Sequence, residues 1–372
     1  MSSLAFYRVA IPFRQGFKHG SAERTQTQAV WVEASRDGVT GVGEGCPREY
    51  VTGESLETAE RFLTAHRPTW ERGFEKLDDM TRWLHENEDI VDQNPAAWCA
   101  VELAYLDLFG RERAQSVEEL TGAPPVRGSF RYTAVVGDSD ADTFDATVGR
   151  YRRVGFSDFK LKLCGDMDRD REKLALLRKY EVPENQVRVD ANNLWDDTGE
   201  AIRHLTALDF AFFGVEEPVA ADQLDALREI SRAIGCRIIL DESLVRIRQL
   251  ELLLPDPETW ILNVRVSKMG GVVRCLDLLD RSNEMGLPVI VGAQVGETSL
   301  LTRAGLLVAA AAGDSLLGQE GAFGTFLLEQ DVCEPPLMFG AGGTLDADAL
   351  GLASRPGLGI EVTAAESIFQ PL

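Results

Sequence analysis

Short apolar runs alternate with longer amphipathic stretches through most of the chain, and this order restricts the fold more than any other feature. Successive runs begin about 22 to 28 residues apart, the length of one strand-plus-helix unit. Strands joined by such helices lie parallel, so eight units favour a closed (β/α) barrel. The runs are Arg131–Val136, Phe159–Leu163, Val187–Val189, Phe210–Val215, Arg237–Leu240, Trp260–Val266, Pro288–Val291 and Ser315–Leu317.

Helical spacing marks several of the stretches between these runs. Asp168–Tyr180 and Gly271–Met285 carry leucines on one face, and the second ends in a Gly-Leu-Pro stop. Thr198–Leu208 is a third predicted helix, with Thr198 as its expected N-cap. The alternative fold is an open doubly wound sheet, which usually has a glycine-rich loop after its first strand. Residues 137–140 (GDSD) do not form such a loop.

The two ends of the chain have a different pattern. Leu4–Ile11 and Gln28–Glu33 alternate apolar and polar residues, and Leu56–Arg72 and Asn94–Phe109 have helical spacing. We therefore expect an α+β capping domain over residues 1–125 and the barrel over 126–340. Residues 341–372 are rich in turns, and we expect them to pack back on the capping domain.

The net charge and the cysteine content restrict the binding partners and the cellular compartment expected for the protein. The chain has 60 acidic and 38 basic residues and a formal net charge of −22, which disfavours nucleic acids and anionic membranes as partners. Its six cysteines form no C-x-x-C pair, and neither a secretory signal nor a membrane-length apolar run is present. We expect a cytoplasmic enzyme that acts on a small molecule and forms a homo-oligomer.

Three consecutive strands end in a carboxylate. Asp190, Glu216 and Asp241 follow the third, fourth and fifth runs. The carboxyl ends of parallel strands meet at one face of a barrel, where three carboxylates repel unless a cation joins them. Oxygen ligands suit Mg²⁺, or Mn²⁺ in its place, and none of the four histidines lies at these ends to favour zinc.

Lysines flank the acidic cluster in the chain. Lys160 and Lys162 share one face of the second strand, and Lys268 follows the sixth strand. Neighbouring ammonium groups and a cation lower the pKa of a lysine, which then becomes a base near pH 7. Taken singly, each acid is more simply explained as a helix cap or a loop charge, and each lysine as a residue that faces solvent. The functional interpretation therefore depends on all of them occurring together at successive strand ends.

At these residues the sequence resembles the enolase superfamily, specifically its muconate-lactonizing-enzyme subgroup. The resemblance extends over nearly the whole chain and implies a modified TIM barrel, (β/α)7β, with an N-terminal α+β capping domain. The motifs that carry it are Lys160-x-Lys162, Asp190-Ala191-Asn192-x-x-Trp195, Val215-Glu216-Glu217-Pro218, Asp241-Glu242-Ser243 and Lys268-Met269-Gly270-Gly271.

The resemblance also implies roles for these residues. Asp190, Glu216 and Asp241 would hold Mg²⁺, and Lys162 and Lys268 would be acid and base on opposite faces of the substrate, with Lys160 tuning Lys162. Such enzymes abstract the proton α to a carboxylate through an enediolate, because a dication stabilises the developing charge. The expected reaction is racemisation, epimerisation or cycloisomerisation of a small carboxylic acid or amino-acid derivative.

Two alternatives remain open at this point. One is a lyase that performs syn β-elimination, such as o-succinylbenzoate synthase or a dehydratase, in which one lysine makes both proton transfers. The other is a barrel that has lost catalysis and only binds or supports another molecule. All the expected acid and lysine positions of the barrel are filled, which disfavours the second alternative.

Substrate specificity in this family lies in capping-domain loops, here expected at Phe13–Arg24 and Pro47–Glu54. His19, Arg48 and Tyr50 are the candidate substrate-binding residues in them, together with Glu320 after the eighth strand. Dipeptide epimerases typically have an Asp-x-Asp pair there for the substrate ammonium. Residues 319–323 read QEGAF instead, and this departure argues against a dipeptide substrate.

Overall fold

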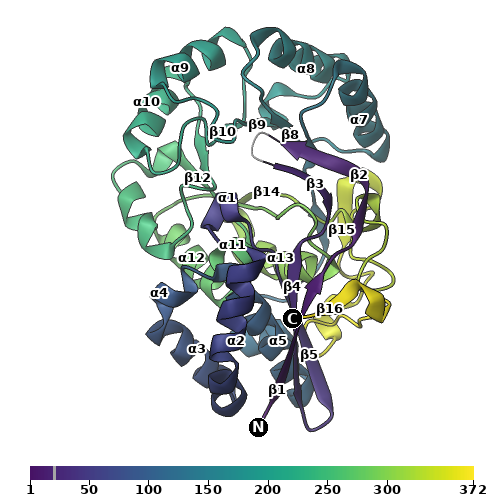
Figure 1. Cartoon of the computed structure of the whole chain (residues 1–372). Helices are drawn as coiled ribbons and strands as arrows, with labels where there is room; N and C mark the ends of the chain where they lie inside the picture. The colour runs from purple at the N-terminus through teal and green to yellow at the C-terminus, as the bar shows by residue number, and fades with distance from the viewer. Residues whose placement is uncertain (20–21) are drawn as a thin grey trace.

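The structure is a computed structural model that describes residues 1–19 and 22–372. Its largest sheet has eight parallel strands in chain order, from β7 to β14, curled into a barrel (Figure 1). The backbone N–H of Thr133 donates to the carbonyl of Gln319 at 2.7 Å and joins the last strand to the first. The strands are β7 Ala134–Val136, β8 Phe159–Lys162, β9 Val187–Asp190, β10 Gly214–Glu216, β11 Ile238–Leu240, β12 Trp260–Val264, β13 Val289–Val291 and β14 Leu316–Gln319.

Helices cover the outside of this barrel. A 3-10 helix, η2 Ile247–Leu253, takes the place of an α-helix between β11 and β12. Within the described residues no α-helix follows β14, because the next element is the short 3-10 helix η5 Gly324–Phe326. The (β/α)7β expectation is therefore confirmed. The α-helices are α7 Ala141–Val154, α8 Met167–Lys179, α9 Thr198–Ala207, α10 Leu224–Ile234, α11 Val266–Met269, α12 Val272–Glu284 and α13 Ser299–Ala312.

Three details of the strand and helix predictions were wrong. Arg131 belongs to a separate strand, β6 Ser129–Arg131, which pairs antiparallel with β15 Thr344–Asp346. Phe210 and Phe212 precede β10 and pack on each other at 4.9 Å between ring centroids, so their apolar character reflects packing outside the sheet. The N-cap of α9 is Asp197, whose carboxylate accepts from the N–H of Glu200 at 2.7 Å.

The capping region is an antiparallel sheet of order β16-β1-β4-β5 with helices against it (Figure 1). The edge strand beside β1 comes from the end of the chain. A loop was expected at 13–24, but the described residues of this segment belong to two strands, β2 and β3, which pair antiparallel. The elements are β1 Ser3–Val9, β2 Pro12–His19, β3 Ala22–Gln26, β4 Ala29–Arg36, β5 Val39–Gly45, β16 Phe369–Pro371, α1 Glu49–Thr52, α2 Leu56–Gly73, α3 Leu77–Glu86, α4 Glu88–Val91, α5 Pro95–Arg113 and α6 Val117–Thr121.

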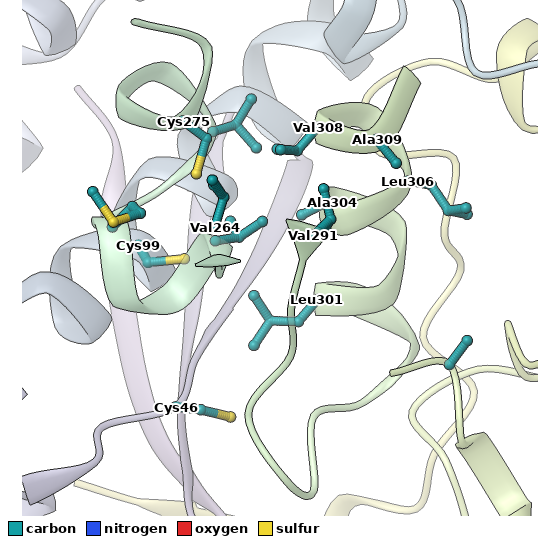
Figure 2. Packing of buried hydrophobic residues seen from close by; sticks show 14 of the residues in the cluster. Cys46, Cys99, Val264, Cys275, Val291, Leu301, Ala304, Leu306, Val308 and Ala309 are labelled. Carbon is teal, nitrogen blue, oxygen red and sulfur yellow. The ribbon is translucent and has the colours of Figure 1, made fainter. Parts of the chain in front are cut away.

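Helix α5 packs between the capping sheet and the barrel, and apolar side chains fill both contacts. Figure 2 shows Cys99 of α5 and Cys275 of α12 near Val264 and Val291 of the barrel strands, with Leu301 of α13 beside them. All these side chains are buried, and all six cysteines are free thiols. None of the helices in the described ranges is long and apolar enough to span a bilayer.

Three glycines of β5 allow α5 to approach the sheet closely. A Cβ added at Gly43 would lie 1.9 Å from the carbonyl oxygen of Ala100, and the same clash recurs at Gly41 and Gly45. We expect Gly43→Ala to lower the free energy of unfolding by about 3 kcal/mol, because rigid backbone faces the new methyl group. Urea unfolding followed by circular dichroism measures this change. Gly73→Ala is the control, since nothing lies within 4 Å of its added Cβ.

A buried carboxylate, Glu44 of β5, joins the capping sheet to α13. Its oxygens accept from Thr298 Oγ1 at 2.6 Å, from the Thr298 N–H at 3.1 Å and from the Leu301 N–H at 3.3 Å. These donors are free because the first turn of a helix leaves its N–H groups without intrahelical partners. The capping sheet is therefore fixed to the helix that precedes β14.

Glu102 of α5 makes the stability of the fold depend on pH. Burial raises its pKa from 4.5 to about 8, and only its Oε1 has a donor, the N–H of Val273. The folded chain thus keeps a proton that the unfolded chain releases, so this contribution falls as pH rises from 4.5 to 8. We expect Glu102→Gln to reduce that slope by up to about 1.4 kcal/mol per pH unit. Urea unfolding of metal-free protein at a series of pH values measures it, with exposed Glu86→Gln leaving the slope unchanged.

Candidate active site

The three acids and three lysines of the prediction all lie at the carboxyl ends of the barrel strands. Each of these six side chains is buried. The structure brings them into one cluster, as the strand order requires. They come from β8 (Lys160 and Lys162), the last residues of β9 and β10 (Asp190 and Glu216), the residue after β11 (Asp241), and α11 after β12 (Lys268).

Strand register sets the first half of the cluster. Asp190 is paired with Lys162 on one side and with Glu216 on the other, so the three side chains lie at one level of the barrel. Lys162 Nζ lies 2.5 Å from Asp190 Oδ2. Lys160 Nζ lies 2.7 Å from Glu216 and 3.0 Å from Asp190. Both lysines of the pair therefore point into the barrel.

Lys268 forms the other half of the cluster. Its ammonium donates to Asp241 Oδ1 at 3.0 Å, to the Asp241 carbonyl at 2.9 Å and to the Asn263 carbonyl at 2.6 Å. Strands β8 and β12 are four places apart in an eight-stranded barrel, so Lys162 and Lys268 approach the centre from opposite sides. Held by these bonds, the Lys268 side chain does not line the cavity above the strands in this structure.

Arg265 is a site residue that the sequence reasoning missed. It follows β12, donates to Gln294 Oε1 at 3.0 Å and hydrogen-bonds to Asp241 Oδ2. It also lines the cavity above the strands. The available signal was the alternation of Asn263 and Arg265, two polar side chains on one face of an otherwise apolar run.

The electrostatics show an excess of negative charge at Glu216. Burial and the neighbouring charge of Asp190 raise its pKa to about 8, although Lys160 opposes the shift. Burial lowers the pKa of Lys160. The charges of Asp190, Glu216 and Glu320 together raise it by more than burial lowers it, so the net change is upward. The upward shift arises without a cation at these acids, where carboxylates surround Lys160 more closely than ammonium groups do, so the lowered lysine pKa expected beside a bound cation stays a prediction.

The residues present fit a hard divalent cation. Asp190, Glu216 and Asp241 offer only oxygen donors, which Mg²⁺ prefers. Apart from the 2.7 Å ion-pair contact with Lys160 Nζ, Glu216 Oε2 is buried without a hydrogen bond, and the neighbouring carboxylates that raise the pKa of Glu216 carry the charge that a cation would neutralise. Lysine and arginine side chains now engage the three acids. Among the described residues no three His, Cys, Asp or Glu side chains stand at metal-binding distance from one another.

Two of the four candidate substrate-binding residues line the cavity, and one does not. Tyr50 and Glu320 line the cavity. Arg48 does not, because its guanidinium donates to the carbonyls of Gln28, Pro47 and Val295 at 2.7–2.9 Å. It is buried and ties the capping loop to the segment after β13. The side chain of His19 lies outside the described part of the structure.

A cavity of about 330 Å³ opens above the cluster. Lys160, Lys162, Arg265 and Glu320 form its inner wall, together with Gln294. Arg14 of β2 also borders the cavity and donates to the carbonyls of Thr325, Leu328 and Glu329. The hairpin of β2 and β3 is thereby fastened to the segment that follows β14.

The sequence and the fold both match known proteins. A family model described as Enolase C-terminal domain-like matches residues 143–366. The N-succinyl-L-Arg/Lys racemase of Bacillus cereus is 24% identical and covers 97% of this chain and 95% of its own, and its crystal structure has a TM-score of 0.82. The L-Lys-D/L-Arg epimerase of Methylococcus capsulatus is 28% identical over 94% of each chain.

A dipeptide epimerase from Cytophaga hutchinsonii, solved with Mg and the dipeptide D-Ala-L-Val, shares the fold. Its TM-score is 0.86 at 21% identity, and the match covers 100% of this chain and 99% of that one. These relatives are isomerases, and the family model spans more than half of the chain. The chain therefore belongs to the enolase superfamily.

Proposed function

We propose that this protein is a Mg²⁺-dependent racemase or epimerase that acts on the carbon next to the carboxylate of a small N-acylated amino acid. The observation that carries the proposal is the placement of Lys162 and Lys268 on opposite sides of Asp190, Glu216 and Asp241. Inversion at a carbon requires a proton to leave one face and another to arrive at the opposite face. Two lysines across a barrel meet that requirement.

A divalent cation held by Asp190, Glu216 and Asp241 would neutralise the substrate carboxylate and the negative charge that develops as the α-proton leaves. Lys162 lines the cavity and takes the proton from one face. Lys268 returns a proton to the other face, and the roles reverse for the opposite enantiomer. Lys160, which forms ion pairs with Glu216 and Asp190, holds positive charge beside the reacting centre.

Lys268 has to leave its contact with Asp241 before it can act. Asp241 Oδ1 accepts from Lys268 at 3.0 Å, and Arg265 bonds to the other oxygen of the same carboxylate. A cation held at Asp241 would share these oxygens and weaken both contacts, whereas the bonds from Lys268 to the carbonyls of Asp241 and Asn263 would remain.

The eighth strand supports a substrate whose nitrogen is acylated and uncharged. Arg188 lies 2.9 Å from Glu320 Oε1 and Lys160 lies 3.3 Å from it, so this carboxylate is already neutralised. The next acidic position of an Asp-x-Asp pair is filled by Ala322. A free ammonium would find no unpaired carboxylate at Glu320 or Ala322. A relative named for N-succinylated amino acids agrees with this choice.

Incubation in D₂O with Mg²⁺ tests the proposal. N-acetyl and N-succinyl amino acids, and dipeptides with a free amine as the comparison, are followed by NMR and chiral chromatography. We expect N-acylated substrates to appear as both enantiomers with deuterium at the α-carbon, and dipeptides to react at least tenfold more slowly. An alkene product without deuterium in the recovered substrate would establish β-elimination instead.

A further inference from the structure

The cavity above the lysines continues along one face of α7. Residues Thr143, Thr147, Arg150 and Tyr151 line it, and their spacing places them on a single stripe of the helix. The facing wall consists of Phe323 and Phe326 from the segment after β14. We call the space between these six residues the α7 groove. One cavity thus connects Lys162 with the outer part of α7.

The groove exists because of the fold. In a complete (β/α)8 barrel a helix after the last strand packs against the first helix. In the described chain no α-helix follows β14, and Phe323 and Phe326, at the start of the segment after β14, line the groove opposite this face of α7. From Thr143 to Arg150 the helix rises about 10 Å, at about 1.5 Å per residue. A chain that lies along the groove from Thr143 to Arg150 therefore spans about 10 Å.

Arg150 is the unusual member of the groove. Its guanidinium carbon lies 4.4 Å from the ring centroid of Phe326 and 5.9 Å from that of Tyr151. With the side chains that the structure describes it makes no hydrogen bond or ion pair. Lys160, Lys162 and Arg265 in the same cavity are each paired with a carboxylate. A guanidinium held on an aromatic face keeps its N–H donors directed outward for a planar anion.

The rest of the groove offers little to a polar chain. The hydroxyl of Thr147 donates to the carbonyl of Thr143 at 2.8 Å, and the hydroxyl of Thr143 donates to Asp140 at 2.8 Å. Asp138, at the inner end, is neutralised by Lys173 at 2.8 Å and by Arg169 at 3.0 Å. What remains exposed to a ligand is methyl groups and aromatic rings.

From these contacts we propose that the substrate carries, beyond its reacting carbon, an apolar chain of about 10 Å that ends in a carboxylate. The chain lies in the α7 groove and the carboxylate pairs with Arg150. This inference rests on the proposed function, since it places the reacting carbon at Lys162. It specifies the distal part of the substrate, which the lysines and the acids do not.

Binding of three N-acylglycines to the Mg²⁺-loaded protein tests the groove. These are N-suberoylglycine, its terminal carboxamide and N-acetylglycine, measured by calorimetry. Glycine has no side chain, so side-chain specificity does not interfere. We expect the terminal acid to bind about tenfold more tightly than the amide, as a charge-assisted pair predicts. Arg150→Gln should abolish this difference. Arg153→Gln, an exposed arginine of the same helix outside the cavity lining, should preserve it.

A second variant tests the path of the chain. Thr147→Trp fills the groove. It should weaken the binding of N-suberoylglycine at least tenfold and leave the binding of N-acetylglycine unchanged. The inference is overturned if N-suberoylglycine does not bind, if the acid and the amide bind equally to the wild type, or if Arg150→Gln keeps the preference. Exchange of the α-protons of N-acetylglycine in D₂O reports the proposed function separately, because this probe does not reach the groove.

Discussion

Replacement of Lys268 by alanine is expected to reduce racemisation by about 10³-fold or more, since a positioned acid or base contributes about 10²–10⁴-fold to a proton transfer. The variant should nevertheless exchange the α-proton of one enantiomer with solvent, because Lys162 still faces the cavity. Lys162→Ala should show the reverse and exchange only the other enantiomer. Proton NMR of each pure enantiomer in D₂O measures both effects.

This pair of results separates an opposite-face mechanism from a one-base mechanism. If Lys162→Ala removed exchange for both enantiomers while Lys268→Ala kept both, a single lysine would perform all proton transfers. Lys179→Ala is the control, because Lys179 is an exposed residue of α8 paired with Asp145. It should retain full activity. Thermal unfolding of all three variants shows whether a loss of activity reflects a loss of fold.

Replacement of Glu216 by glutamine is expected to abolish Mg²⁺ binding and to lower activity by at least about 10²-fold, as expected when charge stabilisation of a transition state is lost. The metal-free variant should be as stable as the wild type or more stable. The reason is that burial and the charge of Asp190 raise the pKa of Glu216 to about 8, so folding near pH 7 must add a proton to this carboxyl group, which the neutral amide does not require. Calorimetry with Mg²⁺ and urea unfolding in EDTA measure the two effects.

Mass action gives a further check on this site. Mg²⁺ at 100 times its Kd should stabilise the wild type by about 2.7 kcal/mol and leave Glu216→Gln unchanged. Glu200→Gln, at an exposed position of α9, should behave as the wild type in both assays. If Glu216→Gln bound Mg²⁺ normally, Glu216 would not be a metal ligand. If activity survived EDTA, the mechanism would not require a metal.

Sequence reasoning located the barrel and the central cluster because both depend on regular spacing. Parallel strands place their carboxyl ends on one face, so Asp190, Glu216 and Asp241 had to converge once the strands were identified. The two-residue period of β8 placed Lys160 and Lys162 on the same side. These inferences need no knowledge of side-chain contacts.

The residues that were missed or misassigned depend on contacts that spacing does not encode. Arg48 was expected at the substrate, but carbonyls from two distant segments hold its guanidinium. Arg265 was overlooked because its partners, Asp241 and Gln294, lie on other strands. The hairpin of β2 and β3 was expected to be a loop, since its residues show no regular apolar alternation. Tertiary partners decide such cases.

The bonds from Glu44 to Thr298 and Leu301 have a consequence for how substrates enter. These hydrogen bonds hold the capping sheet against α13. The close packing of Gly41, Gly43 and Gly45 of β5 on α5 is a second fixed contact of the sheet. A hinge between cap and barrel would have to break buried hydrogen bonds, which is costly. Rotation of the whole cap to admit a substrate would therefore carry the cost of these bonds, and the bonds of Arg14 fasten the β2–β3 hairpin as well. The position of the cap relative to the proton-transfer residues is thus set by the fold before any substrate binds.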